Sequence, residues 1–387
     1  MARLGDVIEQ IRGVSYKPSD LKDTLNDNSV ILLRANNIQD GKIVLDDVLY
    51  VSKSKVNESQ YLRRGDILVC TSSGSKELVG KAAFVDEDLP AVFGAFCKVV
   101  RPKIECCKYV GHFFQSPYYR NYISAASAGA NINNLRNEHI ADLHIPLPPL
   151  DKQRKIAAVL DKVSSLIAKR RQQLDKLDDL VKSRFIEMFG DPVENPHGFR
   201  KVALSELAEI KIGPFGSLLH KEDYIEGGHP LLNPSHIVDG KVVPDSKLTI
   251  SDKKYDELEA YHLHIGDVVM GRRGEMGRCA VVPSEGFLCG TGSLLIRTKG
   301  EVTADYIQKI ISFPSFRKMI EDMAVGQTMP NLNVPIVSKF QIIKPPIEVQ
   351  KNYYKFVTQI DKSKLAIQKS LERLEILKKA LMQKYFG

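Results

Sequence analysis

Leu4-Gly5-Asp6-Val7-Ile8-Glu9 opens a pattern that this chain repeats about 200 residues later, as Leu204-Ser205-Glu206-Leu207-Ala208-Glu209. Further pairs share this spacing: Asp40-Gly41-Lys42 with Asp239-Gly240-Lys241, Gly65-Asp66 with Gly266-Asp267, Pro148-Pro149 with Pro345-Pro346, Gln153 with Gln350, and Phe189-Gly190 with Phe386-Gly387. The offsets stay between 197 and 201 residues, whereas chance matches would scatter. This period is too long for a solenoid repeat of about 20–50 residues. The sequence therefore predicts a duplicated, domain-sized unit and an approximate internal two-fold axis.

Each copy begins with a globular part in which short apolar runs are broken by Gly, Pro, Asn and Ser. Such runs predict strands. In the first copy they are Val30–Arg34, Ile67–Cys70, Lys81–Val85 and Phe96–Val100. Apolar residues at helical spacing predict that the unit opens with a short amphipathic helix. These residues are Leu4, Val7, Ile8 and Ile11.

A proline-rich segment ends each globular part, at Ile145–Pro149 and Ile342–Pro346. Proline fixes φ and biases the preceding residue away from helix, so each segment is a stiff exit. A long helix is expected next, because apolar residues then recur in alternating steps of three and four over about four heptads. The seam positions are Ile156, Leu160, Val163, Ile167, Arg170, Leu174, Leu177, Val181, Arg184 and Met188, and then Val357, Ile360, Lys364, Ile367, Leu371, Leu374, Lys378, Leu381 and Tyr385.

These two helical seams are expected to pair with each other in antiparallel orientation. A helix of roughly 35 residues is on the order of 50 Å long, so the pair would form a rigid strut. The alternative is that each helix packs on its own globular part.

Composition bounds the class of protein. The chain has 387 residues, which suggests two or more domains, and a formal net charge of +8, which leans toward a polyanionic partner. Its six cysteines form no CxxC pair, and no His cluster has zinc-ligand spacing, so we expect scattered buried thiols. The start of the chain does not resemble a signal peptide, and no apolar run approaches 18 residues. We expect a cytoplasmic protein with no membrane partner and no bound metal.

Sequence motifs of catalysis are missing. Gly74–Lys81 resembles a phosphate-binding loop but has one residue too many between its glycines, and Ala82 stands where Ser or Thr is required. GxSxG and HExxH do not occur. The Asn-Pro pairs at 195–196 and 233–234 lack the second proline and aromatic of an adenine methyltransferase. A nuclease that uses Asp245 and Asp252 fits only loosely, because the gap is short and the other copy has no counterpart.

Polar and basic loops remain as candidates for DNA contact. A turn follows each Gly-Asp strand, at Thr71–Lys76 and Gly271–Arg278, and a second loop precedes each proline segment, at Gly129–Arg136 and Gly326–Asn333. Arg can fork onto guanine, and Asn or Gln can pair with adenine or bind phosphate. For any single Asn, the alternative is a turn residue that caps its own backbone. The candidates in these loops are Ser72, Ser73, Lys76, Asn131, Asn133, Asn134, Arg136, Arg272, Arg273, Arg278, Gln327, Asn331 and Asn333.

With these residues in view, the chain resembles the DNA-specificity (S) subunits of type I restriction–modification systems. The resemblance covers both repeats. It is carried by the turn Gly213-Pro214-Phe215-Gly216-Ser217, the Gly-Asp strands, the loop Gly326–Leu332, the segment Ile145–Ile156, and the helix end Ser183–Pro192. The first copy departs from the loop pattern, since Asn131–Leu135 lacks Gln-Thr-x-Pro. Ser217 joins the candidates for DNA binding through this resemblance.

The resemblance implies an α+β fold, with two mixed α/β target recognition domains in a pseudo-two-fold arrangement, joined by two long antiparallel coiled-coil helices. The expected boundaries are 1–145 for the first recognition domain, 146–190 for the first spacer helix, 191–342 for the second recognition domain and 343–387 for the second spacer helix. Residues expected to form the spacer and dock partners are Ile156, Leu160, Val163, Ile167, Leu174, Leu177, Ile360, Ile367, Leu371, Leu374 and Leu381.

By the same resemblance, each recognition domain reads one half of an asymmetric, bipartite target in double-stranded DNA. Two modification (methyltransferase) subunits and the restriction (translocase–nuclease) subunits are the expected protein partners. S-adenosylmethionine, ATP and Mg²⁺ are expected in those partners, and no catalysis or cofactor in this chain. Two alternatives stay open: a nuclease that acts alone on DNA, and a structural coiled-coil adaptor without a DNA role.

Overall fold

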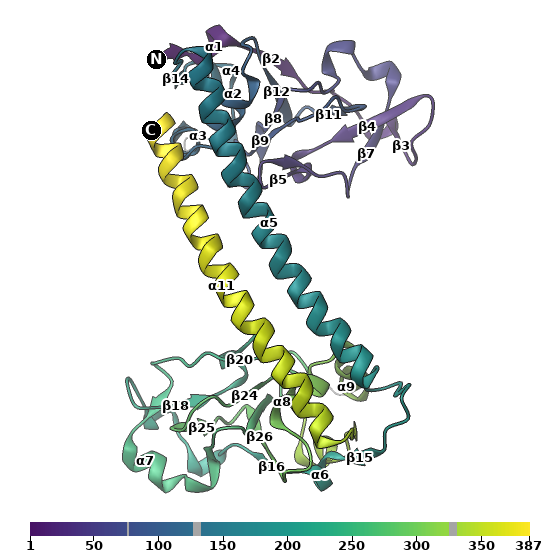
Figure 1. The fold of residues 1–387 in the computed structure, drawn as a ribbon, viewed down its shortest axis with the longest axis vertical. Coiled ribbons are helices and arrows are strands. Elements are labelled where there is room, and N and C mark those ends of the chain that lie inside the picture. The colour runs from purple at the N-terminus through teal and green to yellow at the C-terminus, as the bar shows by residue number, and fades with distance from the viewer. Residues whose placement is uncertain (76, 127–132, 325–330) are drawn as a thin grey trace. The chain divides into compact units, whose positions relative to one another are not determined.

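A computed structural model describes residues 1–75, 77–126, 133–324 and 331–387 (Figure 1). The chain forms two units, Met1–Gln173 with Ile367–Gly387, and Leu174–Ala366. Each unit therefore contains one globular part together with a section of both long helices. These helices are α5 (Leu150–Phe189) and α11 (Ile347–Phe386), each of 40 residues, which confirms the two long helices expected from the heptad pattern.

Unit 1, which comprises Met1–Gln173 and Ile367–Gly387, is built on two four-stranded sheets. The first has the order β10-β8-β12-β2, with strands Ala82–Phe84, Ile67–Cys70, Cys97–Pro102 and Ile8–Arg12, all antiparallel to their neighbours. The second has the order β11-β4-β7-β3, with strands Ala91–Phe93, Ser29–Leu33, Leu49–Ser52 and Leu21–Lys22, and β11 is parallel to β4. The four strands predicted from apolar runs in this unit are thereby confirmed.

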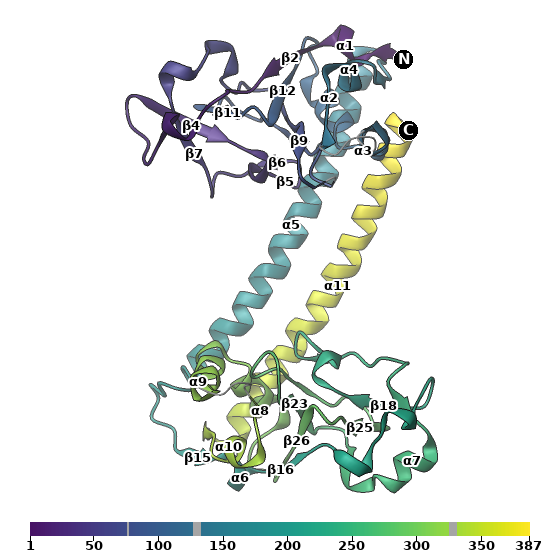
Figure 2. The same ribbon diagram turned by 180° about the vertical axis from the view of Figure 1, so that it is seen from behind.

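Short ladders and helices complete unit 1. The ladders pair β1 (Ala2–Arg3) with β14 (His144–Ile145), β5 (Ile38–Gln39) with β6 (Lys42–Ile43), and β9 (Ser72–Ser73) with β13 (Asn133–Asn134). The helices are α1 (Leu4–Val7), α2 (Cys107–Phe113), α3 (Pro117–Ala126) and α4 (Asn137–Ala141). Helices α2 and α3 lie beside the start of α5 and share a core with it (Figures 1 and 2).

Unit 2 repeats this plan. One sheet has the order β16-β26-β23-β24, with strands Ala208–Ile212, Ser293–Thr298, Val268–Gly271 and Cys279–Val281. The other has the order β17-β21-β18-β25-β22, with strands Tyr224–Ile225, Thr249–Ile250, His229–Leu232, Phe287–Cys289 and His262–Leu263. The ladders pair β15 (Lys201–Ala203) with β27 (Gln341–Ile343), and β19 (Ile237–Val238) with β20 (Lys241–Val242).

The helices of unit 2 are α6 (Leu204–Leu207), α7 (Asp252–Glu257), α8 (Ala304–Ile311), α9 (Pro314–Ala324) and α10 (Val334–Ser338). Helix α7 packs beside β18 and β25, as Figure 2 shows from behind. Helices α8, α9 and α10 share a large core with β23, β26 and both long helices.

The predicted helix over residues 4–11 is wrong beyond its first turn. Helix α1 ends at Val7, and Ile8 and Ile11 lie on strand β2, which pairs with β12 over five residues. Both side chains are buried in the sheet. Pairing with a strand about ninety residues away therefore overrides the local helical spacing of these apolar residues.

The repeated sequence motifs are structural. Asp40-Gly41 and Asp239-Gly240 have positive φ at both residues, as a tight two-residue hairpin requires, and they connect β5 to β6 and β19 to β20. The Gln153 amide donates to the Pro148 carbonyl (2.8 Å), and that of Gln350 donates to the Pro345 carbonyl (2.9 Å). Each glutamine thus fixes the proline-rich segment to the first turns of the helix that follows.

Within each unit the two long helices run antiparallel. In unit 1, Arg171 of α5 pairs with Glu375 of α11 at 2.9 Å, while Leu160, earlier in α5, shares a core with Phe386, later in α11. In unit 2, Asp178 pairs with Lys364, and Phe185 packs on Tyr353 with ring centroids 5.6 Å apart. The helices therefore contact each other and also the globular cores, so both packing alternatives describe part of the arrangement.

The six cysteines are free thiols, and all except the half-buried Cys107 are buried, as expected. Among the described residues, no helix is both long and apolar enough to cross a membrane.

Candidate DNA-binding surface

Two candidate loops meet in unit 1. Strand β9, in the turn after β8, pairs antiparallel with β13, so Ser72 lies opposite Asn134 and Ser73 opposite Asn133. The ladder continues where the Leu135 amide donates to the Thr71 carbonyl at 2.8 Å. Residues that are about sixty positions apart in the sequence thereby form one surface. Asn134 and Arg136 are exposed on it, and Ser72 and Ser73 are half-buried.

The same crossing occurs in unit 2. The Leu332 amide donates to the Arg272 carbonyl at 2.9 Å, and the Arg272 Nε donates to the Leu332 carbonyl at 3.0 Å. Arg272 and Leu332 therefore occupy the positions that Thr71 and Leu135 hold in unit 1. Burial, together with the neighbouring charge of Arg273, lowers the pKa of the Arg272 guanidinium. Arg272 is thus partly engaged by the protein, whereas Arg273 is exposed.

A third segment, which the sequence patterns did not predict, reaches this surface in both units. In unit 2, Gly213 lies against residues 290–293: its amide donates to the Ser293 carbonyl, and a Cβ on Gly213 would lie 2.0 Å from the Gly290 oxygen. The Arg272 amide donates to the Gly292 carbonyl at 2.9 Å. The turn that carries Ser217 and the turn that carries Arg272 therefore meet on the same segment.

Unit 1 has the equivalent contact at Phe96. Its carbonyl accepts hydrogen bonds from the amides of Thr71 and Ser72 (2.8 and 3.1 Å) and from the Thr71 hydroxyl (3.0 Å). Phe96 itself is 69% exposed. These hydrogen bonds hold Phe96 beside Ser72, so its position adds it to the candidate surface. In unit 2, Phe215 is 62% exposed beside Ser217, which is itself exposed in a single 3₁₀ turn.

Several other candidates are engaged within the protein. Arg278 forms an ion pair with Glu275, and Glu275 also pairs with Arg317 at 3.0 Å. Hydrogen bonding from Arg278, with the charges of both arginines, lowers the pKa of the Glu275 carboxyl. The Asn333 side chain caps α10 by accepting a hydrogen bond from the Ile336 amide at 3.0 Å, which is the alternative role considered for such residues.

Asn331 differs from Asn333, because its Oδ1 is buried and has no hydrogen-bond partner within the described ranges. Lys76, Asn131 and Gln327, also predicted as DNA-binding candidates, lie outside the described residues, as does the side chain of Asn133. The assignment of all these residues to DNA contact stays a prediction.

The predicted spacer residues show a graded burial. Those near the start of α5 are buried in unit 1, and those further along the two helices are half-buried. The buried group is Ile156, Leu160, Val163 and Ile167, and the half-buried group is Leu174, Leu177, Ile360, Ile367, Leu371, Leu374 and Leu381. Their role in partner docking also stays a prediction.

The residues of the nuclease alternative do not form a metal site. The Asp245 carboxylate accepts a hydrogen bond from the Lys247 amide at 2.9 Å, and Asp252, nearly fully exposed, lies 3.3 Å from the His229 Nε2. In the part of the chain that the structure describes, no three or more His, Cys, Asp or Glu side chains are grouped so that they could hold a metal ion.

Comparison with known proteins identifies this arrangement. Residues 1–178 and 196–377 match the model of the type I restriction modification DNA specificity domain, so the match repeats as the sequence does. The chain is 29% identical to the EcoKI specificity subunit of Escherichia coli (strain K12) over 412 residues, which cover 100% of the chain and 88% of that protein. It is 40% identical to the StySPI specificity subunit of Salmonella potsdam over 182 residues, or 47% of the chain and 39% of that protein.

A solved structure has the same fold. It comes from work on the assembly and conformational transition of the type I R-M system, and matches with a TM-score of 0.60 over 100% of this chain and 99% of the other, at 19% identity. The family match spans nearly the whole chain and falls on both repeats. The chain therefore belongs to the family of type I restriction–modification DNA specificity subunits.

Proposed function

We propose that each unit reads one half of an asymmetric, bipartite DNA target on behalf of a type I restriction–modification complex. One observation carries the proposal: the same crossing of two loops occurs in both units, but with different side chains. Ser72 and Ser73 lie on it in unit 1, and Arg272 and Arg273 lie on it in unit 2. A repeated scaffold with unlike reading residues fits a target whose two halves differ in sequence.

The energies of base recognition are adequate for this role. A good bidentate contact contributes roughly 1–3 kcal/mol of discrimination against the wrong base. A few such contacts from each surface would give the usual gap of about 4–10 kcal/mol between specific and non-specific binding. Basic side chains that bind phosphate would add affinity that falls with salt and carries no sequence information.

We propose that α5 and α11 set the distance between the two half-sites. At about 1.5 Å per residue, a helix of 40 residues is roughly 60 Å long. Half-sites one turn of DNA apart are separated by about 34 Å, which a rigid element of this length can span. Paired helices suit the task, because a flexible linker would allow several spacings.

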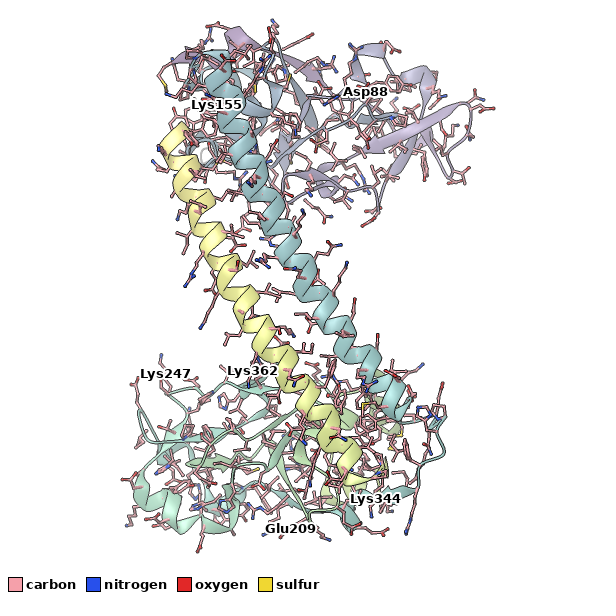
Figure 3. All side chains as sticks on the ribbon, viewed as in Figure 1. Asp88, Lys155, Glu209, Lys247, Lys344 and Lys362 are labelled. Carbon is pink, nitrogen blue, oxygen red and sulfur yellow. The ribbon has the colours of Figure 1, made fainter. Side chains whose placement is uncertain are left out.

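The partners that we propose for the helices are two modification (methyltransferase) subunits, with restriction subunits completing the complex. Charged side chains such as Lys155 of α5 and Lys362 of α11 project from the exposed faces of these helices (Figure 3). Apolar side chains are exposed as well: Val159 and Leu166 stand one heptad apart on α5. Exposed apolar residues among charged ones are typical of a surface that binds another protein.

We further propose that this chain catalyses nothing by itself, and that S-adenosylmethionine, ATP and Mg²⁺ bind to the partner subunits. The missing catalytic motifs support this view. The experiment is to incubate the purified chain with mixed-sequence DNA and Mg²⁺, with and without the modification subunits. DNA cleavage by the chain alone would support the nuclease alternative. Methylation of one bipartite sequence, only when the modification subunits are present, is the expected result.

Profiling the methylated bases of a genome that carries this system would report both half-sites and the gap between them. Variants at the two loop crossings then separate DNA reading from a purely structural adaptor. Arg273→Ala should relax or abolish recognition of one half-site and leave the other intact. Unchanged recognition in variants of both crossings would favour the adaptor.

A further inference from the structure

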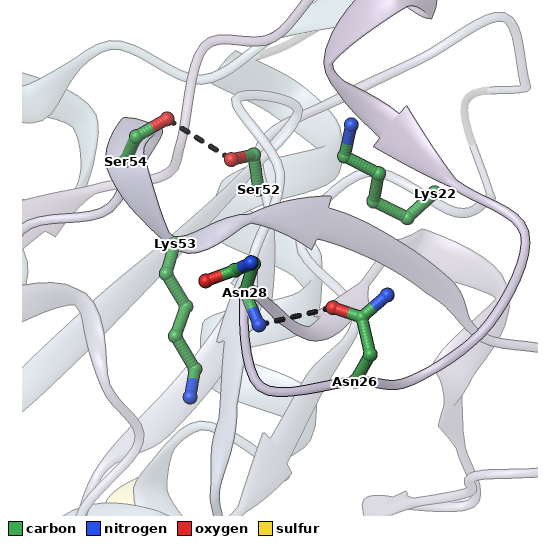
Figure 4. A pocket seen from close by; sticks show the side chains of 6 residues that line it. All are labelled: Lys22, Asn26, Asn28, Ser52, Lys53 and Ser54. Carbon is green, nitrogen blue, oxygen red and sulfur yellow. Dashed lines mark hydrogen bonds between the residues drawn. The ribbon is translucent and has the colours of Figure 1, made fainter.

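A polar hollow of about 510 Å³ lies in unit 1 at one end of the β11-β4-β7-β3 sheet (Figure 4). Its lining residues are Lys22, Asn26, Asn28, Ser52, Lys53 and Ser54. None of these six is acidic, and they supply two ammonium groups, two amides and two hydroxyls. Figure 4 shows Lys22 and Lys53 on either side of Asn28.

The loop that forms one wall of this hollow is held in place by its own hydrogen bonds. The backbone N–H of Asn28 donates to the Asn26 Oδ1 at 3.0 Å, and the backbone N–H of Asn26 donates to the Ser29 hydroxyl at 2.8 Å. On the other wall, the hydroxyls of Ser52 and Ser54 lie 3.0 Å apart. Because the Asn26 oxygen is engaged, its NH₂ group is the part of that side chain left to donate to a ligand.

The charge of the two lysines in the hollow is available to a ligand. Asp20 pairs with Lys55 at 3.4 Å, and the acids that adjoin lining residues in the sequence are Asp23 and Asp27. Among the described residues, neither Lys22 nor Lys53 forms an ion pair. Two unpaired ammonium groups beside amide and hydroxyl donors are a set that suits a phosphate, with its single negative charge and several acceptor oxygens.

Unit 2 does not have the two lysines of this hollow at the equivalent positions. Lys22 lies opposite Tyr50 between β3 and β7, and Ile225 lies opposite Thr249 between β17 and β21 in the same register. The same register makes Val51 equivalent to Ile250, and two positions further along unit 1 has Lys53 where unit 2 has Asp252. The repeat has therefore preserved the sheet while replacing two lysines by an apolar residue and an acid.

We propose that this hollow of unit 1 binds a phosphate of the DNA backbone outside the first half-site. The inference rests on the proposed DNA-reading function. Strand β4 begins beside the hollow and ends at Leu33, whose carbonyl accepts from the Gly94 amide, next to the segment that holds Phe96. From Asn28 to Leu33 is five residues, or about 17 Å at ~3.3–3.4 Å per residue. At about 3.4 Å per base pair, the phosphate lies roughly five base pairs from the bases that the loop crossing reads.

The test uses the full chain assembled with its modification subunits, and the duplex that methylation profiling identifies. Affinity is measured over a range of salt for wild type, for Lys22→Ala with Lys53→Ala, and for a control of equal charge loss, Lys103→Ala with Lys152→Ala. Each phosphate that the protein neutralises contributes about 0.9 to the slope of log K against log salt. Because both lysines face one phosphate, the hollow variant should lower the slope by about one and weaken target and non-target DNA alike, whereas the control should keep the wild-type slope.

A second arm places the contact on the DNA. Single methylphosphonates, which remove one backbone charge, are scanned along the duplex, and one position about five base pairs outside the first half-site should weaken binding by wild type only. An unchanged slope in the hollow variant, or a scan that affects both proteins equally, overturns the proposal. The proposal is also overturned if inorganic phosphate weakens DNA binding by wild type but no methylphosphonate position does, because the hollow would then be a site for a free anion. If the wild-type complex binds no DNA, the proposed function itself fails. If the wild-type complex binds its DNA and the hollow variant binds with the same affinity and salt slope, the phosphate proposal fails and the proposed function stands.

Discussion

Asp66 accepts two hydrogen bonds from Arg101, with Nε–Oδ1 at 2.7 Å and Nη2–Oδ2 at 2.8 Å, and it also accepts one from the Arg63 amide at 2.9 Å. The Asp66 side chain is 1% exposed. Unit 2 repeats this arrangement with Asp267 and Arg297. Hydrogen bonding to the aspartate raises the pKa of each guanidinium. The repeated Gly-Asp motif therefore supplies a buried aspartate whose ion pair with a partly buried arginine joins the strand after the glycine to the next strand of the sheet.

Removing the arginine of such a pair leaves a buried carboxylate without compensation, which costs about 3–5 kcal/mol. We expect Arg101→Ala to destabilise unit 1 by this amount and Arg297→Ala to destabilise unit 2. Hydrogen exchange should report the difference locally: the first variant loses protection of β8 and β12, and the second loses protection of β23 and β26. Each variant is the control for the other, and equal loss in both units from either substitution would contradict the local role.

Arg272 and Arg273 are adjacent, yet their substitution should have different consequences. Arg272→Ala removes a hydrogen bond to the Leu332 carbonyl and should cost about 0.5–1.5 kcal/mol of stability as well as DNA recognition. Arg273→Ala removes an exposed side chain and should change stability by no more than about 0.5 kcal/mol while still impairing recognition of one half-site. Thermal melting together with DNA binding by the assembled complex separates the two effects. If both variants showed the same melting temperature and the same DNA affinity, the separate roles of Arg272 and Arg273 would be contradicted.

Phe96→Ala should weaken binding to the first half-site with little effect on folding. The ring is 69% exposed, so its removal takes little buried surface from the folded state. If it contacts a base or a thymine methyl, a loss of roughly 1–3 kcal/mol corresponds to about 5- to 150-fold weaker binding. Phe215→Ala is the matched variant in unit 2 and should affect the second half-site instead. Wild-type affinity in both variants would remove these rings from the reading surface.

The acid side of the stability profile should depend on Asp161 of α5. This carboxylate bonds to the His112 Nε2 at 2.8 Å and pairs with Lys108 at 2.9 Å, so helix α2 is joined to α5. Hydrogen bonding to His112, and then to Lys108, lowers the Asp161 pKa from 3.8. A depressed folded-state pKa adds stability that is present above the unfolded value and is lost as pH falls through the folded value. Asp161→Asn should therefore flatten the fall in melting temperature below about pH 4.

Asp46→Asn, at an exposed loop position of the same unit, is the control for that measurement and should leave the acid profile unchanged. A profile for Asp161→Asn that falls as steeply as that of wild type would show that the bond to His112 does not contribute.

Local patterns explain what the sequence predicted and what it missed. The 40-residue helices and the buried strands could be predicted because apolar periodicity is a property of neighbouring residues. The crossing of the loops could not, because it depends on the Thr71–Leu135 and Arg272–Leu332 hydrogen bonds between segments that the sequence separates by about sixty residues. Phe96 was expected to begin a strand, but β12 begins one residue later, at Cys97, which leaves the ring in the turn.

The proposed spacer can be tested at the boundary between the two units. That boundary lies between Gln173 and Leu174 on α5 and between Ala366 and Ile367 on α11. Inserting seven residues at both points keeps the heptad phase, and it leaves the Arg171–Glu375 pair within unit 1 and the Asp178–Lys364 pair within unit 2. Seven residues add about 10.5 Å of helix, or roughly three base pairs of DNA.

If the helices set the spacing, methylation profiling of the double insertion should report the same two half-sites with a gap about three base pairs longer. A four-residue insertion in α5 alone is the contrasting variant. It lengthens α5 by about 6 Å and turns the following residues by about 40° beyond a full turn, which shifts the seam of α5 against α11, so it should abolish methylation of any fixed-gap target. If the double insertion methylates the original sequence with its original gap, the distance between half-sites is set elsewhere, and the helices serve only to hold the partners.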